Sequence, residues 1–161
     1  MHSASSGPRP SKLVFDPVPT LRSMAILGVL GIALIHLLDL PGTIGPDPIQ
    51  GTLYLVLVVS CVATAGLLLH AASPWRWLLV LALAAAPAGA YVLTRTVGLP
   101  FDQTDIGNWD DTLGIAALFV EALVFSTGAY ALVLWRRIAA SGEPDRSAYP
   151  MATELGAWES S

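Results

Sequence analysis

The chain has 161 residues, of which 54% are hydrophobic and only 12% are charged, and its formal net charge at pH 7 is −4. Soluble domains carry roughly 25% charged residues, so this composition excludes a disordered chain and an ordinary soluble enzyme. The single cysteine excludes a disulfide scaffold, and the acidic balance excludes nucleic acid as a partner, because phosphate binding needs a basic face.

Four stretches are long and apolar enough to cross a bilayer, which requires roughly 20 mainly apolar residues per helix. In chain order they run from about Leu21 to Leu40, Thr52 to Ala72, Trp75 to Leu99 and Thr112 to Trp135. These runs are too long for barrel strands and do not alternate in polarity. We therefore predict an all-α bundle of four transmembrane helices, with the chain broken after the first span at Pro41-Gly42.

Basic residues predict the orientation of these spans, because they are enriched in cytoplasmic connections. They precede the first span, separate the second from the third, and follow the fourth: Arg9, Lys12, Arg22, Arg76, Arg136, Arg137 and Arg146. The other two connections hold the aspartates Asp47, Asp102, Asp105, Asp110 and Asp111. We predict that both termini are cytoplasmic, with polar tails at residues 1–20 and 136–161 and two acidic loops outside.

Small residues and tryptophans predict how the helices pack. The third span contains Ala82, Ala84, Ala85, Ala86, Ala88, Gly89 and Ala90, and small residues permit close helix contact in lipid. We therefore expect it to be the central helix of the bundle. Indole rings favour the membrane interface, and we expect that position for the tryptophans at the predicted span ends, Trp75, Trp77, Trp109 and Trp135.

Ionisable residues inside a membrane are costly and often functional. Glu121 lies about ten residues beyond the start of the fourth span, roughly 15 Å deep, on the same helix face as Gly114 and Ala117. Arg95 lies near the outer end of the third span and interrupts the positive-inside pattern. Glu121, Asp39 and the loop aspartates are its candidate partners. We hypothesise that Arg95 neutralises Glu121 or Asp39.

His36 and Asp39 share one face of the first helix at i,i+3 spacing, near its outer end. They form either a hydrogen-bonded pair beside Arg95 and Glu121 or, as the weaker alternative, two ligands of a metal site. His70 lies near the opposite end of the second span. Haem ligation by His36 together with His70 is therefore disfavoured, because two axial ligands must lie at one depth. We predict no cofactor, and we expect Cys61 to be an inert core residue.

One part of the chain resembles a family. The segment Thr94-Arg95-Thr96-Val97-Gly98-Leu99-Pro100, the loop Asp105-Ile106-Gly107-Asn108-Trp109, the helix from Gly114 to Glu121 and the pair His36-Leu37 carry the resemblance. They are similar to those of small, uncharacterised, actinobacterial-type four-helix integral membrane proteins. The resemblance covers the helical region and singles out Arg95, His36 and Glu121. It implies a multi-pass protein of a bacterial plasma membrane and no particular activity.

Three functions are open on this sequence. The first is a subunit or accessory factor of a membrane complex, without a self-contained catalytic site and with other membrane subunits or further copies of itself as partners. The second is a proton- or cation-coupled transporter or channel in which Glu121 titrates. The third is an extracytoplasmic metal or redox site at His36 and Asp39. In each, the polar cluster of Glu121, Arg95, His36 and Asp39 is the candidate site.

Overall fold

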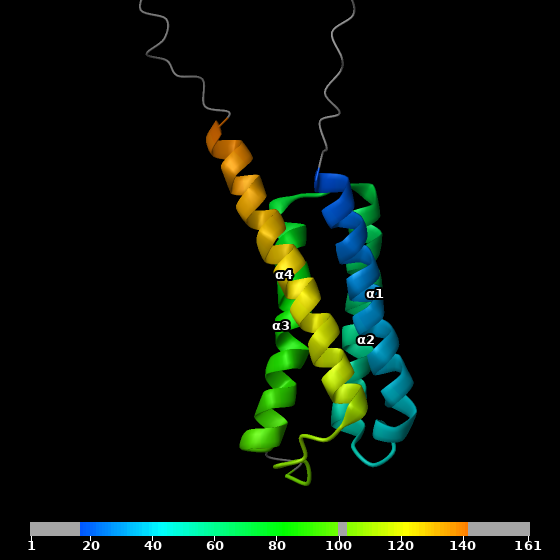
Figure 1. Cartoon of the computed structure of the whole chain (residues 1–161). Coiled ribbons are helices and arrows are strands. Elements are labelled where there is room, and N and C mark those ends of the chain that lie inside the picture. The colour runs from blue at the N-terminus through cyan, green and yellow to red at the C-terminus, as the bar shows by residue number, and fades with distance from the viewer. Residues whose placement is uncertain (1–16, 100–102, 142–161) are drawn as a thin grey trace, which may run out of the picture.

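The computed structural model describes residues 17–99 and 103–141, and these residues form a bundle of four helices. They are α1 (Pro17–Thr43), α2 (Pro48–His70), α3 (Pro74–Thr96) and α4 (Thr112–Ser141). Successive helices run in opposite directions, so both ends of the described chain lie at one end of the bundle (Figure 1). All four are long and apolar enough to cross a membrane, which confirms the predicted fold class.

The α1–α2 and α3–α4 connections lie together at the other end, which we call the loop end (residues 44–47, 97–99 and 103–111). The loop end carries the aspartates that the sequence singled out, apart from Asp102. Residues 1–16, 100–102 and 142–161 lie outside the described residues, and most of both predicted tails falls among them.

Two helices continue beyond the ends predicted for their spans. α1 includes Pro41 and Gly42, where we expected the chain to break, and the amide of Ile44 still donates to the carbonyl of Leu40 at 3.0 Å. α4 continues past Trp135 through two arginines to Ser141. Hydropathy marks the part of a helix that suits lipid, and α4 continues beyond that part because arginine has good helix propensity. α1 remains helical through Pro41 and Gly42 although both residues have poor helix propensity.

The helix ends that border the loop end have local causes. The Asp47 side chain accepts hydrogen bonds from the amides of Ile49 and Gln50 at 3.0 and 3.1 Å, and Pro48 follows at the first helical position of α2. α3 ends where Gly98 adopts a φ of +73°, a left-handed conformation that favours glycine, and its amide donates back to the Leu93 carbonyl.

The packing of the bundle differs from the expectation in two respects. α1, and not the alanine-rich α3, is the central helix: it packs extensively against both α2 and α4, whereas α3 packs mainly against α4 and meets α2 only weakly. At Gly28, α1 comes so close to Val124 of α4 that a Cβ would overlap that side chain. Trp77 is 1% exposed, so its indole ring packs in the core and is not presented to lipid as we expected.

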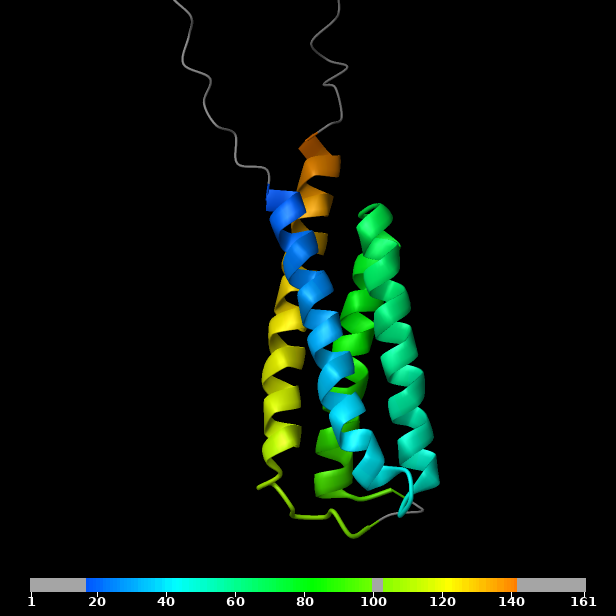
Figure 2. The same ribbon diagram turned by 90° about the vertical axis from the view of Figure 1, so that its right-hand side faces the viewer.

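The outer surface of the bundle is apolar. Large side chains such as Leu27, Val59, Phe119 and Leu123 are exposed on different helices, while the core is narrow and made of small and medium side chains. The side view shows all four helices lying roughly along one common axis, with α1 and α2 nearer the viewer and α3 partly behind them (Figure 2). Such a surface suits hydrocarbon on all sides, as expected of a multi-pass membrane protein.

Candidate functional site

The weak contact between α2 and α3 leaves a cavity in the half of the bundle nearer the loop end. Its volume is about 340 Å³. Its walls are mainly apolar and include Leu53 and Val56 of α2 and Ala86 and Ala90 of α3. All four of these residues are also exposed on the surface, so the cavity opens sideways between α2 and α3. In a bilayer this opening faces lipid.

The four residues of the predicted polar cluster all line this cavity. His36 and Asp39 reach it from α1, Arg95 from α3 and Glu121 from α4. Three of them are buried: Glu121 is 2% exposed, Arg95 7% and His36 8%. The buried acid, base and imidazole therefore surround one space.

His36 and Glu121 face each other across the cavity. The Nδ1 atom of His36 lies 2.9 Å from the carbonyl oxygen of Ile32, one turn earlier in α1. Because a carbonyl only accepts, Nδ1 carries the proton, and Nε2 is left facing Oε1 of Glu121 at 4.0 Å. The second carboxylate oxygen, Oε2, is buried and has no hydrogen-bond partner among the described residues. Glu121 thus retains an acceptor that the fold does not use.

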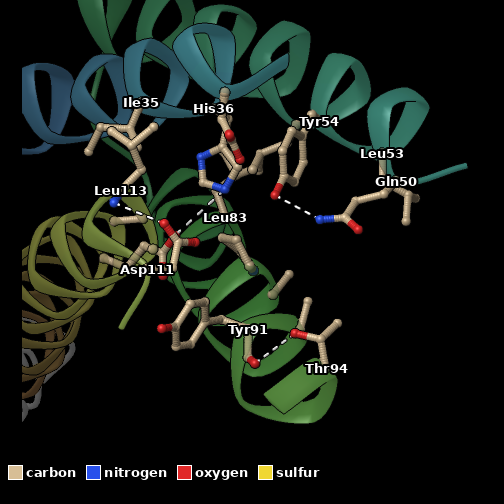
Figure 3. Close-up of a pocket in the computed structure, with 18 of the residues that line it drawn as sticks. Ile35, His36, Gln50, Leu53, Tyr54, Leu83, Tyr91, Thr94, Asp111 and Leu113 are labelled. Atoms are coloured by element: carbon tan, nitrogen blue, oxygen red, sulfur yellow. Dashed lines mark hydrogen bonds and ion pairs between the residues drawn. The ribbon is translucent and has the colours of Figure 1, made fainter. Parts of the chain in front are cut away.

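Two polar residues of α2 complete this side of the site, and the sequence did not single them out. The ring of Tyr54 meets His36 edge-on with centroids 4.9 Å apart, and its hydroxyl accepts a hydrogen bond from Gln50 Nε2 at 3.0 Å (Figure 3). Gln50 and Tyr54 are spaced i,i+4, which places them on one helix face. This i,i+4 spacing of two polar residues in an apolar helix was the sequence signal that could have identified them.

Arg95 pairs with two aspartates of the loop end. Its Nη1 lies 2.5 Å from Oδ2 of Asp105, and its Nη2 lies 3.2 Å from Oδ2 of Asp111. Nη1 also donates to the hydroxyl of Thr94 at 3.2 Å, and the guanidinium lies over the Tyr91 ring, 4.6 Å from its centroid. The hypothesis that Arg95 neutralises Glu121 or Asp39 is therefore wrong, and the loop aspartates are its partners.

The ion pairs have a geometric cause. Arg95 lies in the last turn of α3, where its side chain reaches the α3–α4 connection, and the Arg95 carbonyl accepts the amide of Gly107 at 2.9 Å. Asp111 is held in turn by the first turn of α4, whose Leu113 amide donates to Oδ1 at 3.1 Å. Both contacts fasten the connection over one end of the cavity.

Gly114 allows the helices to meet at this point. A Cβ there would overlap the ring of Tyr91 and come within 2.8 Å of Oδ2 of Asp111. Only glycine therefore lets Tyr91 of α3 lie against the start of α4 while Asp111 reaches Arg95. Gly114, Ala117 and Glu121 do share an inward face, as the sequence predicted, since Ala117 is 8% exposed and Glu121 2%.

The remaining candidates lie apart from this arrangement. His70 is exposed at the end of α2 far from the loop end, whereas His36 is buried in the other half of the bundle. Cys61 is fully buried as a free thiol in the core. Within residues 17–99 and 103–141, no three His, Cys, Asp or Glu side chains lie close enough to hold a metal ion.

No family model, curated protein or solved structure matches this chain.

Proposed function

We propose that this protein is a non-catalytic integral membrane protein, an accessory factor of a bacterial plasma membrane, that binds a small apolar-bodied molecule in the cavity between α2 and α3. The cavity itself carries the proposal. Binding sites for small molecules are typically concave and of roughly 300–1,000 Å³, with apolar walls and a few convergent polar groups. The cavity of about 340 Å³ has these properties, with His36, Tyr54 and Glu121 among its polar groups.

The lateral opening supports a ligand that arrives through the bilayer. Ala86 and Ala90 leave space at the mouth, and the apolar walls suit the hydrocarbon part of an amphiphile. The arrangement lacks the usual parts of a hydrolytic or nucleophilic site: Cys61 is in the core away from the lining, and Ser60 lines the cavity with no hydrogen bond to His36 in the described part of the chain. A binding function requires no such parts.

Proton- or cation-coupled transport is the second candidate, and one observation favours it. Glu121 is 2% exposed and its Oε2 has no partner among the residues described, as expected of a carboxyl group that takes up and releases a cargo ion. If Glu121 has this role, the E121Q variant reconstituted in liposomes should show no flux of the bound molecule. Flux that persists in E121Q would exclude this role for Glu121.

A binding experiment tests the first proposal. Full-length protein in detergent micelles is dialysed to equilibrium against three probes of related shape: tetraphenylphosphonium (cationic), tetraphenylborate (anionic) and triphenylphosphine oxide (neutral). Protein-free micelles serve as the blank. We expect saturable binding of at least one probe, abolished by A86F, which fills the cavity mouth.

The matched control is A85F, which adds the same ring to the neighbouring residue of α3. Ala85 is exposed and does not line the cavity, so A85F should bind the probe like the wild type. Failure of all three probes to bind, or equal binding by A86F and the wild type, would contradict the proposed function.

A further inference from the structure

The charged side chains around the cavity are mainly acidic. Three carboxyl groups, those of Asp39, Asp111 and Glu121, line the space, whereas Arg95 is the only lysine or arginine among the described lining residues. The guanidinium of Arg95 is already occupied, because it binds Asp111 and also Asp105 from the loop. No further lysine or arginine among the described lining residues therefore balances Asp39 and Glu121, and His36 is the basic side chain that faces Glu121.

Glu121 is the most unusual of these acids. Its carboxyl group is almost fully buried, yet Oε2 has no hydrogen-bond partner among the described residues, and Nε2 of His36 lies 4.0 Å from Oε1. A buried polar atom without a partner is unfavourable unless a ligand supplies one. Oε2 itself is buried in the cavity wall, but Glu121 lines the cavity, so a change of its side-chain rotamer would bring this oxygen to a ligand there.

The surroundings of Glu121 restrict the chemistry of this ligand. The walls are mainly apolar, the imidazole of His36 lies beside the acid, and the ring of Tyr54 packs against that imidazole. A hydrated metal ion is poorly matched to such walls, since carboxylate-rich cages suit it better. An organic cation is well matched, because its charge meets the carboxylate while its hydrocarbon part contacts the apolar walls and aromatic faces.

From this geometry we propose that the cavity selects a lipophilic organic cation of single charge, with Glu121 as its counter-ion and Asp39 as a secondary acidic group near the loop end. The inference rests on the proposed binding function and specifies its ligand. Such a molecule enters from the bilayer between α2 and α3 with its apolar groups against Leu53 and Ala86, and its positive centre lies toward Glu121.

The three charged and neutral probes distinguish this inference from the binding function alone. Tetraphenylphosphonium should bind more tightly than tetraphenylborate or triphenylphosphine oxide. E121Q should weaken tetraphenylphosphonium binding about tenfold to a hundredfold, which is the usual effect of losing one charged contact in a partly buried site. Binding of triphenylphosphine oxide should remain unchanged in E121Q, and this result also reports that the cavity is intact.

D110N is the matched control for the change in overall charge. Asp110 is an exposed loop acid that does not line the cavity, so its neutralisation should leave all affinities unchanged. If E121Q fails to fold and loses every probe, D39N decides: a selective loss of the cation supports the inference, and an equal effect on all probes overturns it.

Two results separate the possible failures. If tetraphenylborate or the neutral oxide binds at least as tightly as the cation, or if E121Q and D39N leave cation affinity unchanged, the cation inference is overturned while the binding function stands. If none of the three probes binds, the binding function fails and the inference fails with it.

Discussion

Replacing Arg95 with leucine should destabilise the protein through the loss of its contacts to the loop end. The side chain of Arg95 is 6% exposed and holds two aspartates, Asp105 at 2.5 Å and Asp111 at 3.2 Å. It also covers the ring of Tyr91. R95L keeps an apolar chain against that ring but leaves both carboxylates without their cation. The α3–α4 connection then loses its attachment to the end of α3.

The expected magnitude follows from the burial of the partners. Removing one member of a fully buried ion pair destabilises a protein by roughly 3–5 kcal/mol. Asp105 and Asp111 are 26% and 34% exposed, so water can hydrate them once the guanidinium is gone. We therefore expect a smaller decrease in the free energy of unfolding, about 2 kcal/mol for the ion pairs, together with roughly 0.5–1 kcal/mol for the lost cation–π contact.

The free energy of unfolding can be measured by titrating purified protein in mixed micelles with sodium dodecyl sulfate and following helicity by circular dichroism. R136L is the control, because Arg136 is exposed beyond the apolar part of α4 and its replacement should change stability by less than about 0.5 kcal/mol. Combining R95L with D111N, and separately with E121Q, gives two double-mutant cycles.

The two cycles should differ. Arg95 contacts Asp111, so we expect a coupling free energy of about 1 kcal/mol or more with D111N and a value near zero with E121Q. The reasoning would be refuted if R95L were as stable as the wild type. It would also be refuted if the coupling to E121Q exceeded the coupling to D111N, because Arg95 would then pair with the acid inside the bundle.

Three further predictions follow from close contacts and burial. G114A should lower the free energy of unfolding by about 1–3 kcal/mol because its Cβ overlaps the ring of Tyr91. G89A, with open space around the Cβ inside α3, should keep or slightly raise the free energy of unfolding in the same titration. R76Q should lower it by about 1 kcal/mol, because Nη1 of Arg76 donates to two terminal carbonyls of α2; unchanged stability would show that these bonds contribute nothing. Cys61 should react with a maleimide only after denaturation, and rapid labelling of the folded protein would contradict its burial.

The sequence predicted the four helices and the residues of the site for different reasons. A helix that suits lipid is encoded locally, in a run of apolar residues, so hydropathy located every helix. The four site residues were found because ionisable groups are rare in such runs, and all four do line one cavity. Helix ends were located less well, because Pro41 and the residues after Trp135 remain helical outside the apolar stretches.

Contacts between side chains of different helices could not be predicted from local hydropathy. Which acid meets Arg95 depends on the rotation and neighbours of α3, and a single sequence does not determine either. The loop aspartates were among the alternatives because they follow α3 closely in the chain. The central position of α1 was missed because small residues permit close packing without requiring it, and Ala85 and Ala86 of α3 are in fact exposed.

The central claim is that the space between α2 and α3 is a binding site, and a crystal structure with tetraphenylarsonium tests it most directly. This cation has nearly the shape of tetraphenylphosphonium, and anomalous scattering from its arsenic atom locates it independently of the protein. The account predicts an anomalous peak inside the cavity, with the phenyl groups between Leu53 and Ala86 and the charge toward Glu121. A peak elsewhere on the protein, or a cavity closed by direct contact of α2 with α3, would contradict the account.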